Sequence, residues 1–302
     1  MPDLILHGIP VEDTFAEAFD MAATALVLTA DTPHWAEVAA RTMTGFATSV
    51  IGCGVEAGID RALGPEETPD ERPGVRVLLF GFDTKSLGQQ LLKRVGQCVL
   101  TSPGSACFAG VSGSQRLKLG AGLRVFGDGF QTAKRIGGRR FWRIPVMDGE
   151  FVCEHDTATV SGAVGGGNLL FLGRHPAGTL KVAEAAVSAA AKVDDVILPF
   201  PGGVVRSGSK VGSRYKSMIA STNDAYCPTL KGRPRSALAP EVGSVLEIVI
   251  DGFSFEAIAS AMRAALHAAV AAGEENGLVR VTAGNYGGNL GRHHFHLRDL
   301  VG

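Results

Sequence analysis

The sequence predicts an α+β protein made of two similar lobes, and three observations support this prediction. The chain has 302 residues, of which 45% are hydrophobic and 20% charged, enough apolar material for two cores of ordinary size. Each half runs strand, helix, strand and then strand, helix, strand again. The 40 glycines cluster in short loops between apolar runs, which indicates many tight turns.

In the first half, apolar runs predict strands and amphipathic stretches predict helices. Pro33 at the start of one such stretch and Gly45 just after it are typical helix boundaries. The polar sequence GPEETPDERPG separates the two strand–helix–strand units. The expected strands cover residues 24–30, 47–51, 75–80 and 98–101, and the expected helices cover residues 33–43 and 86–95.

The second half repeats the order. Its expected strands cover residues 168–172, 196–200, 245–250 and 279–283, and its expected helices cover residues 176–192 and 254–272. This element order is that of a ferredoxin-like α/β sandwich. A polar turn at residues 148–154 marks the expected boundary, which gives an N-terminal lobe at 1–152 and a C-terminal lobe at 153–302.

The charge and the cysteines exclude several classes of protein. The net charge is −1 and the pI about 6.7, so the chain as a whole lacks the basic field that nucleic acid or an anionic membrane requires. The N-terminus does not resemble a signal peptide, and the apolar run at residues 22–28 is too short to cross a bilayer. Five scattered cysteines without a CxxC pair predict reduced thiols and a cytoplasmic location.

Two glycine-rich motifs resemble nucleotide sites but have the wrong context. GCGVEA at residues 52–57 fits a dinucleotide fingerprint, yet the residues after it read as a turn and not as a helix. GVVRSGSK at residues 203–210 has one residue too many for a Walker loop. Ser207 and Lys210 form an S-x-x-K pair, which keeps a serine acyl hydrolase open as an alternative.

The long connection at residues 199–228 is the richest in groups that could bind a ligand. Its glycines expose backbone N–H groups, its hydroxyls and amides give directional hydrogen bonds, and its cations could balance an anion. A loop of this length in a compact domain is usually functional. The expected substrate-binding residues are Gly202, Gly203, Arg206, Ser207, Ser209, Lys210, Thr222, Asn223 and Tyr226.

Glu247 is the most informative single residue, because it interrupts the otherwise apolar strand VLEIVI. Burial would raise the pKa of its carboxyl and retain the proton, as a general acid–base requires near neutrality. An outward-facing glutamate on a half-exposed strand is equally compatible with the sequence. Weaker candidates are Glu56 and Asp60 in a glycine-rich turn, and Asn285 and Tyr286 after the last strand.

Several stretches together resemble a known family. TGFATSVIGCGVEAGID, PFPGGVVRSGSKVGS, STNDAYCP, EIVIDG and AGNYGGNLG are similar, in this order, to the formylmethanofuran:tetrahydromethanopterin formyltransferases of methanogens and methylotrophic bacteria. The resemblance covers nearly the whole chain. It implies two α/β lobes, a homo-oligomer (dimer or tetramer), and formyl transfer to or from nitrogen 5 of a reduced pterin.

The resemblance also implies how this reaction proceeds. Tetrahydromethanopterin and a methanofuran-type carrier are substrates, no cofactor is permanently bound, and no metal takes part. The glutamate of the EIV strand, Glu247 here, is implied as the proton-handling group.

The chain departs from the methanogen pattern at RYKSMIA after GSKVGS, and it is nearly neutral, which favours a bacterial member. Such members are components of a formyltransferase/hydrolase complex and take formyl from the pterin to the furan amine. A non-catalytic component that only binds pterin is the second alternative.

Overall fold

The computed structural model describes residues 3–113 and 115–302, which form two compact units. One unit contains Met1–Asp20 and Val164–Gly302, and we call it the proximal unit. The other, Met21–Ala163, is called the distal unit. Two long strands, β3 (Phe15–Thr29) and β12 (Val160–Gly173), each contribute residues to both units.

The sheet of the distal unit has the strand order β6–β3–β5–β4, and each neighbouring pair is antiparallel. This is the order expected of a ferredoxin-like sandwich, so the predicted fold is confirmed for this half. Besides β3, the sheet consists of β4 (Glu56–Leu63), β5 (Gly74–Gly81) and β6 (Ala106–Ala109). Helices α1 (Pro33–Thr44) and α3 (Thr84–Arg94) bury Ala40, Met43 and Leu91 against β5.

Two strands expected in this half are wrong in position. Residues 47–51 lead into the short helix α2 (Val50–Cys53), which ends at Gly54 with a φ of 77°. The second strand is β4, whose glycine and aspartate gave it the appearance of a turn. Residues 98–101 continue from α3 through a π-helical turn (Val95–Val99), because the N–H of Leu100 donates to Val95 O at 2.9 Å. The fourth strand is therefore β6.

The distal unit also contains a part that the sequence did not predict. Strands β8 (Thr132–Ile136), β9 (Arg139–Val146) and β10 (Gly149–Glu154) form an antiparallel meander, and β10 pairs with β6 in parallel. The remaining short elements are β7 (Arg116–Lys118), β11 (Asp156–Ala158), α4 (Gly120–Leu123) and the turns η1 (Pro65–Glu67) and η3 (Arg124–Gly127). Residues 148–154, which were expected to form a polar turn, contain part of the turn between β9 and β10 and the whole of strand β10.

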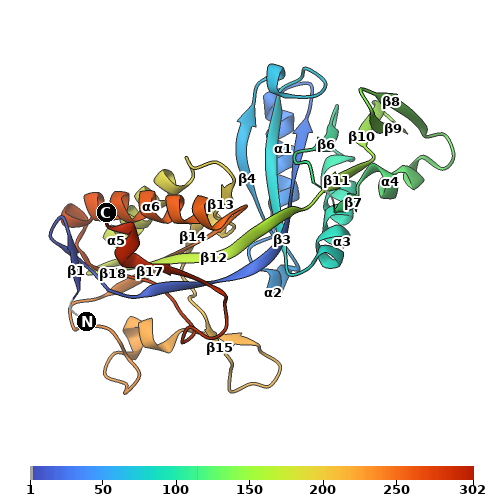
Figure 1. Cartoon of the computed structure of the whole chain (residues 1–302). Helices are drawn as coiled ribbons and strands as arrows, with labels where there is room; N and C mark the ends of the chain where they lie inside the picture. The colour runs from blue at the N-terminus through green and yellow to red at the C-terminus, as the bar shows by residue number, and fades with distance from the viewer. Residues whose placement is uncertain (1–2, 114) are drawn as a thin grey trace. The chain divides into compact units, whose positions relative to one another are not determined.

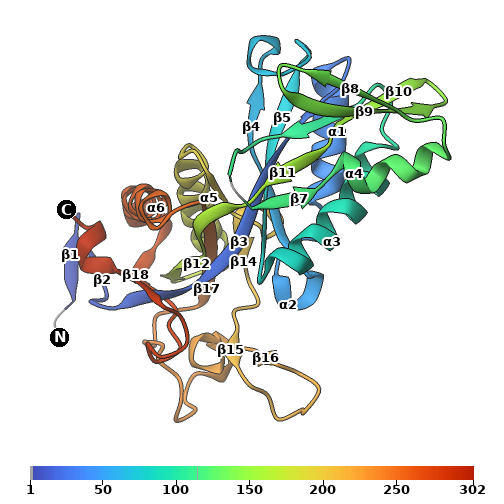
Figure 2. The ribbon, with the colours of Figure 1, turned by 45° about the vertical axis from the view of Figure 1, so that its right-hand side comes forward.

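The proximal unit repeats the ferredoxin-like order as β18–β12–β17 followed by β13 and β14. Its helices lie on one face of this sheet, as Figures 1 and 2 both show. The remaining strands are β13 (Val196–Ile197), β14 (Val204–Val205), β17 (Ser244–Gly252) and β18 (Leu278–Thr282), and the helices are α5 (Pro176–Ala190) and α6 (Phe255–Asn276). Of the strand expected at 196–200, only β13 is formed, and the turn η4 (Pro201–Gly203) separates it from β14.

Close packing of α5 and α6 forms the core of the proximal unit. Phe171, Ile248 and Ile250 face these helices and are fully buried with Met262 and Leu266. The N-terminus of α5 lies so close to the C-terminus of α6 that a Cβ at Gly178 would lie 2.1 Å from Asn276 O. No helix in the described part of the chain is long and apolar enough to span a bilayer.

The first twenty residues belong to the proximal unit because of strand pairing. The hairpin of β1 (Leu4–Leu6) and β2 (Ile9–Val11) adds to β18 at Val11 and Val281, and β19 (His293–His296) pairs with the start of β3. These compact units therefore differ from the lobes 1–152 and 153–302, whose boundary stays a prediction. The last turn, η7 (Leu297–Leu300), packs against α6.

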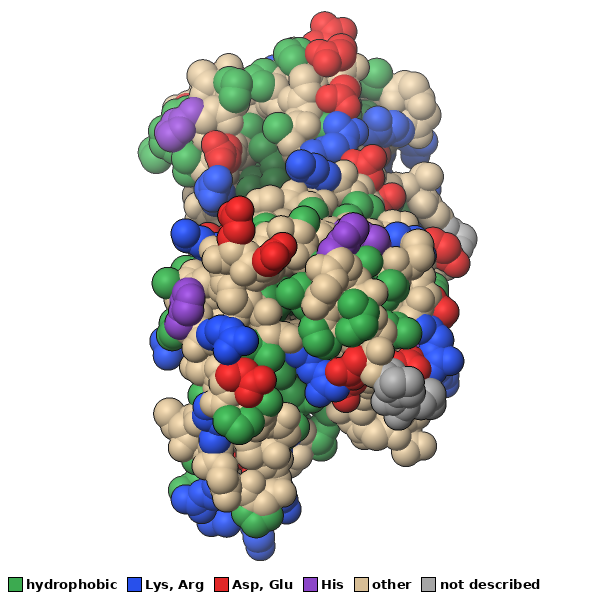
Figure 3. All heavy atoms as spheres, turned by 90° about the vertical axis from the view of Figure 1, so that its left-hand side faces the viewer, with side chains coloured by type: hydrophobic (Ala, Val, Ile, Leu, Met, Phe, Trp, Pro, Cys, Tyr) green, Lys and Arg blue, Asp and Glu red, His purple; other side chains and the backbone are tan. Residues whose placement is uncertain are grey.

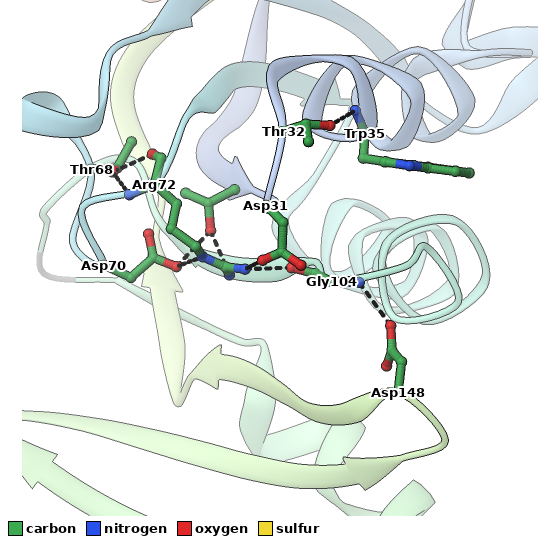
Figure 4. A network of polar contacts seen from close by, with 9 residues as sticks. Asp31, Thr32, Trp35, Thr68, Asp70, Arg72, Gly104 and Asp148 are labelled. Carbon is green, nitrogen blue, oxygen red and sulfur yellow. Dashed lines mark hydrogen bonds and ion pairs between the residues drawn. The ribbon is translucent and has the colours of Figure 1, made fainter.

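Arg72 ties together three segments of the distal unit (Figure 4). Its guanidinium donates to Asp70 at 2.9 Å, to Asp31 at 2.7 Å and to the carbonyl of Gly104 at 2.5 Å. Thr68 holds the backbone of Arg72 by two further hydrogen bonds. The arginine side chain is 29% exposed, so these contacts are only partly screened by water.

We expect Arg72→Met to lower the free energy of unfolding of the distal unit by about 2 kcal/mol, since charged partners lose their hydrogen bonds. Hydrogen exchange at β5 and β6 amides measures this loss. Arg41→Met removes an exposed ion pair with Glu37 and should change the free energy by less than about 0.5 kcal/mol. Equal exchange rates in the two variants would contradict the role given to Arg72.

Candidate active site

The face of the proximal sheet that points away from α5 and α6 carries the candidate site. Leu170 and Leu172 of β12 lie on this face in an apolar cluster with Val242. Glu247 of β17 pairs with Leu170 in the antiparallel register, and paired residues share a face. Glu247 therefore lies on this second face, while its neighbour Ile248 faces the helices.

Burial determines the ionisation of Glu247. Although part of the residue stays accessible, burial raises the pKa of its carboxyl from 4.5 to about 7. Both the acid and the carboxylate are then populated at neutral pH, which suits a group that gives and takes a proton. The catalytic role stays a prediction, and this environment supports it.

The long connection between β14 and β17 starts beside Glu247 and covers the same face. Val205 of β14 pairs with Glu247, and Arg206, Ser207 and Ser209 follow it at exposed positions. The connection then forms the small hairpin of β15 (Lys210–Val211) and β16 (Ala220–Ser221) and the turns η5 (Asp224–Tyr226) and η6 (Pro228–Leu230). In Figure 1 it lies on the side of the sheet opposite the helices.

Tyr226 anchors this connection to the sheet. Its hydroxyl hydrogen-bonds to Thr282 of β18, which is 1% exposed, and its ring packs on the apolar cluster of Leu170 and Leu172. Burial raises the pKa of the Tyr226 phenol, with the charge of Glu12 adding to the effect. The tyrosine predicted to bind substrate thus has a clear structural role.

Lys210 forms an ion pair with Asp224 across the small hairpin. The hydrogen bond from Lys210 lowers the pKa of Asp224 more than any other contact does. Within the described residues, Ser207 has no hydrogen bond to Lys210, so the structure does not bring the S-x-x-K pair together as a nucleophile and its base. This geometry disfavours the serine hydrolase alternative.

The other predicted binding residues divide into two groups. Thr222 and Asn223 lie in the turn before Tyr226, where Thr222 Oγ1 is 3.4 Å from Cys227 Sγ and the carbonyl of Asn223 accepts from the Tyr226 N–H. Gly202 and Gly203 have φ angles of 61° and 77°, and a Cβ at Gly203 would lie 2.8 Å from Val187 of α5. Packing therefore accounts for Gly203 without a ligand.

The loop after β18 brings Tyr286 to the connection. The Tyr286 hydroxyl hydrogen-bonds to Ser209, and burial raises its pKa, with the charges of Glu247 and Glu17 acting in the same direction. Tyr286 is thus close enough to sense the charge on Glu247. Asn285, the other candidate in this loop, donates to Thr14 Oγ1 at 3.2 Å and to the carbonyl of Phe15 at 3.3 Å, and therefore holds the loop to the start of β3.

Glu17 is the main residue that the sequence analysis missed. It is fully buried, and its carboxylate accepts the N–H groups of Tyr286, Gly288, Leu290 and Gly291 at 2.5–2.9 Å. Burial acts to raise the pKa of Glu17, but the four backbone donors together hold it below its usual value. A single carboxylate therefore sets the shape of the loop that carries Tyr286.

Glu56 and Asp60 belong to the distal unit and have structural partners there. Glu56 accepts the N–H of Val50 at the start of α2, and Asp60 pairs with Arg76 at 2.6 Å. Among the described residues, no group of three or more His, Cys, Asp or Glu side chains is arranged to hold a metal ion.

Two sequence profiles of one family together match nearly the whole chain. The sequence profile of formylmethanofuran-tetrahydromethanopterin formyltransferase matches residues 4–146, and that of the proximal lobe of the same enzyme matches residues 149–300. The chain belongs to this formyltransferase family.

Two relatives and two solved structures show how far the similarity extends. One component of the formyltransferase/hydrolase complex of Methylorubrum extorquens is 68% identical over all of this chain and 98% of its own. The formylmethanofuran–tetrahydromethanopterin formyltransferase of Methylococcus capsulatus is 58% identical over 99% of this chain and all of its own.

The crystal structure of the Methylorubrum extorquens formyltransferase/hydrolase complex with methylofuran contains a chain that matches with a TM-score of 0.98, over 99% of both chains. The Methanosarcina barkeri formyltransferase matches with a TM-score of 0.92 at 42% identity, over 98% of this chain and all of its own. Both lobes of this family fold are therefore present here.

Proposed function

We propose that this protein transfers a formyl group between the amine of a methanofuran-type carrier and nitrogen 5 of tetrahydromethanopterin. The single observation that carries the proposal is the buried carboxyl of Glu247, with a pKa of about 7, in a family of formyltransferases. The two carriers are substrates of the proposed reaction, and the transfer is direct, within a complex of the protein with both.

The reaction requires one proton to be delivered and one to be removed. The attacking amine forms a bond to the formamide carbon, and the carbonyl oxygen becomes an oxyanion. Protonated Glu247 donates to the departing nitrogen as its bond to carbon breaks, and the resulting carboxylate takes the proton that the attacking nitrogen loses. The carboxyl is then restored, so no external acid or base is consumed.

The loop and the connection supply groups that could hold the oxyanion and the substrates. Ser207, Ser209 and Tyr286 carry hydroxyls, and each well-placed donor to an oxyanion stabilises a transition state by about 3 kcal/mol. Arg206 is an exposed cation beside β14, available to an anionic group of a carrier. Water must be kept away from the formyl carbon, because attack by water would release formate.

We infer further that the chain works as part of an assembly, as its 68%-identical relative of Methylorubrum extorquens does in a formyltransferase/hydrolase complex. In such an assembly the formyl group passes from the pterin to the furan amine. A homo-oligomer, a dimer or a tetramer, stays a prediction. The five cysteines are all free, which fits a cytoplasmic location.

The pterin ultraviolet spectrum tests the proposed transfer. Purified protein is mixed with N5-formyl-tetrahydromethanopterin and methanofuran, and formyl-furan, free pterin and formate are all quantified. We expect one formyl-furan per pterin released and no formate. Formate production without the amine acceptor would contradict the proposal and favour a hydrolase.

Ser207→Ala separates the transferase from the serine hydrolase. Because Lys210 is paired with Asp224 and not with Ser207, we expect the variant to retain formyl transfer, lowered by at most about 10²-fold, which is the loss of one oxyanion donor. Mass spectrometry of the protein during turnover should detect no acyl-enzyme. A trapped formyl ester on Ser207, absent from the variant, would contradict direct transfer.

A further inference from the structure

Positive charge is concentrated in one segment of the distal unit. Residues 116–143 contain eight Lys or Arg side chains and Asp128 as their only acid, in a chain whose net charge is −1. The face drawn in Figure 3, by contrast, has acidic and basic side chains interspersed over most of its area. The near-zero net charge therefore conceals a local basic field.

These cations gather around the edge of the β8–β9–β10 meander. All five residues of β8 are exposed, and Arg135 of β8 pairs with Arg140 of β9. Beside this hairpin lies a cavity of about 300 Å³. Its charged lining is formed by Arg116, Arg135, Arg139 and Arg140 together with Glu154 and Asp156. We use the name basic hairpin surface for Arg116, Lys118, Lys134, Arg135, Arg139 and Arg140.

Some of these cations are neutralised within the distal unit and others are not. Arg139 pairs with Glu154, which also accepts the N–H of Ala109, and Arg116 pairs with Asp156 at 3.2 Å. In the part of the chain that the structure describes, no carboxylate pairs with the four remaining cations. These are Lys118, Lys134, Arg135 and Arg140.

Arg140 is positioned without being neutralised. Its guanidinium lies 4.6 Å from the ring centroid of Trp142, and Trp142 is buried and donates to His155 Nδ1 at 2.9 Å. Arg124 lies 4.9 Å from the same ring. A guanidinium held in this way loses less side-chain entropy when a carboxylate binds it.

Exposed apolar side chains adjoin these cations. Phe126 is 65% exposed in η3, Phe130 is 77% exposed in the turn that follows, and Ile136 is 56% exposed at the end of β8. An edge strand that only avoids pairing with other chains needs lysine and arginine but no exposed aromatic rings. Basic and apolar groups together are typical of protein interfaces, where Arg and Phe are enriched.

We propose that the basic hairpin surface docks an acidic, partly apolar surface of another protein of the assembly. This inference rests on the proposed assembly, and the docked protein is identified by charge complementarity. Arginine forks match the geometry of carboxylates, and the exposed Phe126, Phe130 and Ile136 would meet no apolar group on a continuous phosphate backbone. A polypeptide with separated carboxylates and apolar contacts fits the surface better than nucleic acid does.

The test uses the Methylorubrum extorquens complex, with this chain in place of its 68%-identical relative and the other components unchanged. The surface variant combines Lys134→Glu with Arg135→Glu, both at exposed positions of β8. The control combines Arg41→Glu with Lys85→Glu, which are exposed in α1 and α3 of the same unit and change the net charge equally. The complex is purified through a tag on another component, at low salt and at about 0.5 M salt. The amount of this chain that is recovered with the complex is then measured.

We expect wild type and control to assemble and recovery of the surface variant to fall at least about tenfold, with a loss of salt dependence. Isolated surface variant should keep its formyl transfer and circular dichroism spectrum. Assembly of the variant equal to the control would overturn the inference alone. Failure of the wild type to assemble would overturn it together with the proposed assembly, while transfer by the isolated chain would remain. RNA binding by the isolated chain is measured as well. If the wild type bound RNA and the surface variant did not, while both assembled equally, the surface would be assigned to nucleic acid instead.

Discussion

Glu247→Gln should lower kcat for formyl transfer by about 10²- to 10⁴-fold, the usual contribution of a general acid–base. Glutamine keeps the shape and a hydrogen-bond donor but cannot give up a proton. The departing amine would then leave without protonation. Steady-state assays with both carriers at saturation measure kcat, and KM should change little because the substitution conserves shape.

Glu241→Gln provides the matched control. Glu241 precedes the same strand but is exposed, so its substitution should leave kcat unchanged. If Glu247→Gln retained more than about a tenth of the wild-type kcat, the carboxyl would serve only as an oxyanion donor or in binding, since an amide can do both.

Glu247 should also make stability depend on pH. Its folded-state pKa of about 7 exceeds the unfolded value of 4.5, so the folded protein binds the extra proton between these values. The free energy of unfolding therefore falls as pH rises from 4.5 to about 7. At pH 8 the ionised carboxylate lowers the free energy of unfolding by up to about 3 kcal/mol, at roughly 1.4 kcal/mol per pKa unit. Glu247→Gln should restore this free energy at pH 8 and have little effect at pH 4, as urea unfolding can measure.

Glu17→Gln has the second-largest expected effect, on the order of 3 kcal/mol in the stability of the loop at residues 284–291. The wild-type carboxylate accepts four backbone N–H groups, two on each oxygen. A glutamine keeps one acceptor oxygen and turns an NH₂ group toward two of the donors. Because Tyr286 then loses its position beside Ser209, formyl transfer should fall at least about tenfold.

The hydrogen-exchange rates of four amides measure the stability of this loop directly. These are the amides of Tyr286, Gly288, Leu290 and Gly291. The lowered pKa of Glu17 makes its contribution present at pH 7 and lost only in acid, as pH falls through the folded-state value. Glu274→Gln, on the exposed face of α6, is the control and should change neither exchange nor transfer. Full protection of these amides in Glu17→Gln, or transfer at the wild-type rate, would contradict the positioning role.

Local sequence patterns were sufficient for most of the fold. Pro33 and Gly45 bounded α1, and the apolar runs at β5 and β17 were recognisable as strands. The order of elements gave the ferredoxin-like arrangement in both halves. β4 was missed because Gly58 and Asp60 are typical turn residues, yet the strand is held by pairing with β5, which local propensity does not reveal.

The candidate site was predictable only in part. Glu247 stood out because it interrupts an apolar strand, but β17 is apolar on both sides of it, so periodicity could not assign its face. Pairing with Leu170 made that assignment. Glu17 sits in the alternating sequence FAEAF and reads as an outward-facing residue. Its four donors lie more than 260 residues later in the chain, and only the folded structure brings them together.

The pH dependence of a single turnover tests the central claim most directly. The reaction is run from formylmethanofuran to tetrahydromethanopterin, because nitrogen 5 is a weakly basic aryl amine that stays uncharged across the range. We predict a rate that is constant in mild acid and falls above one ionisation near pH 7, the pKa of Glu247, with this ionisation absent in Glu247→Gln. The same ionisation in both proteins, or none in the wild type, would contradict Glu247 as the proton donor.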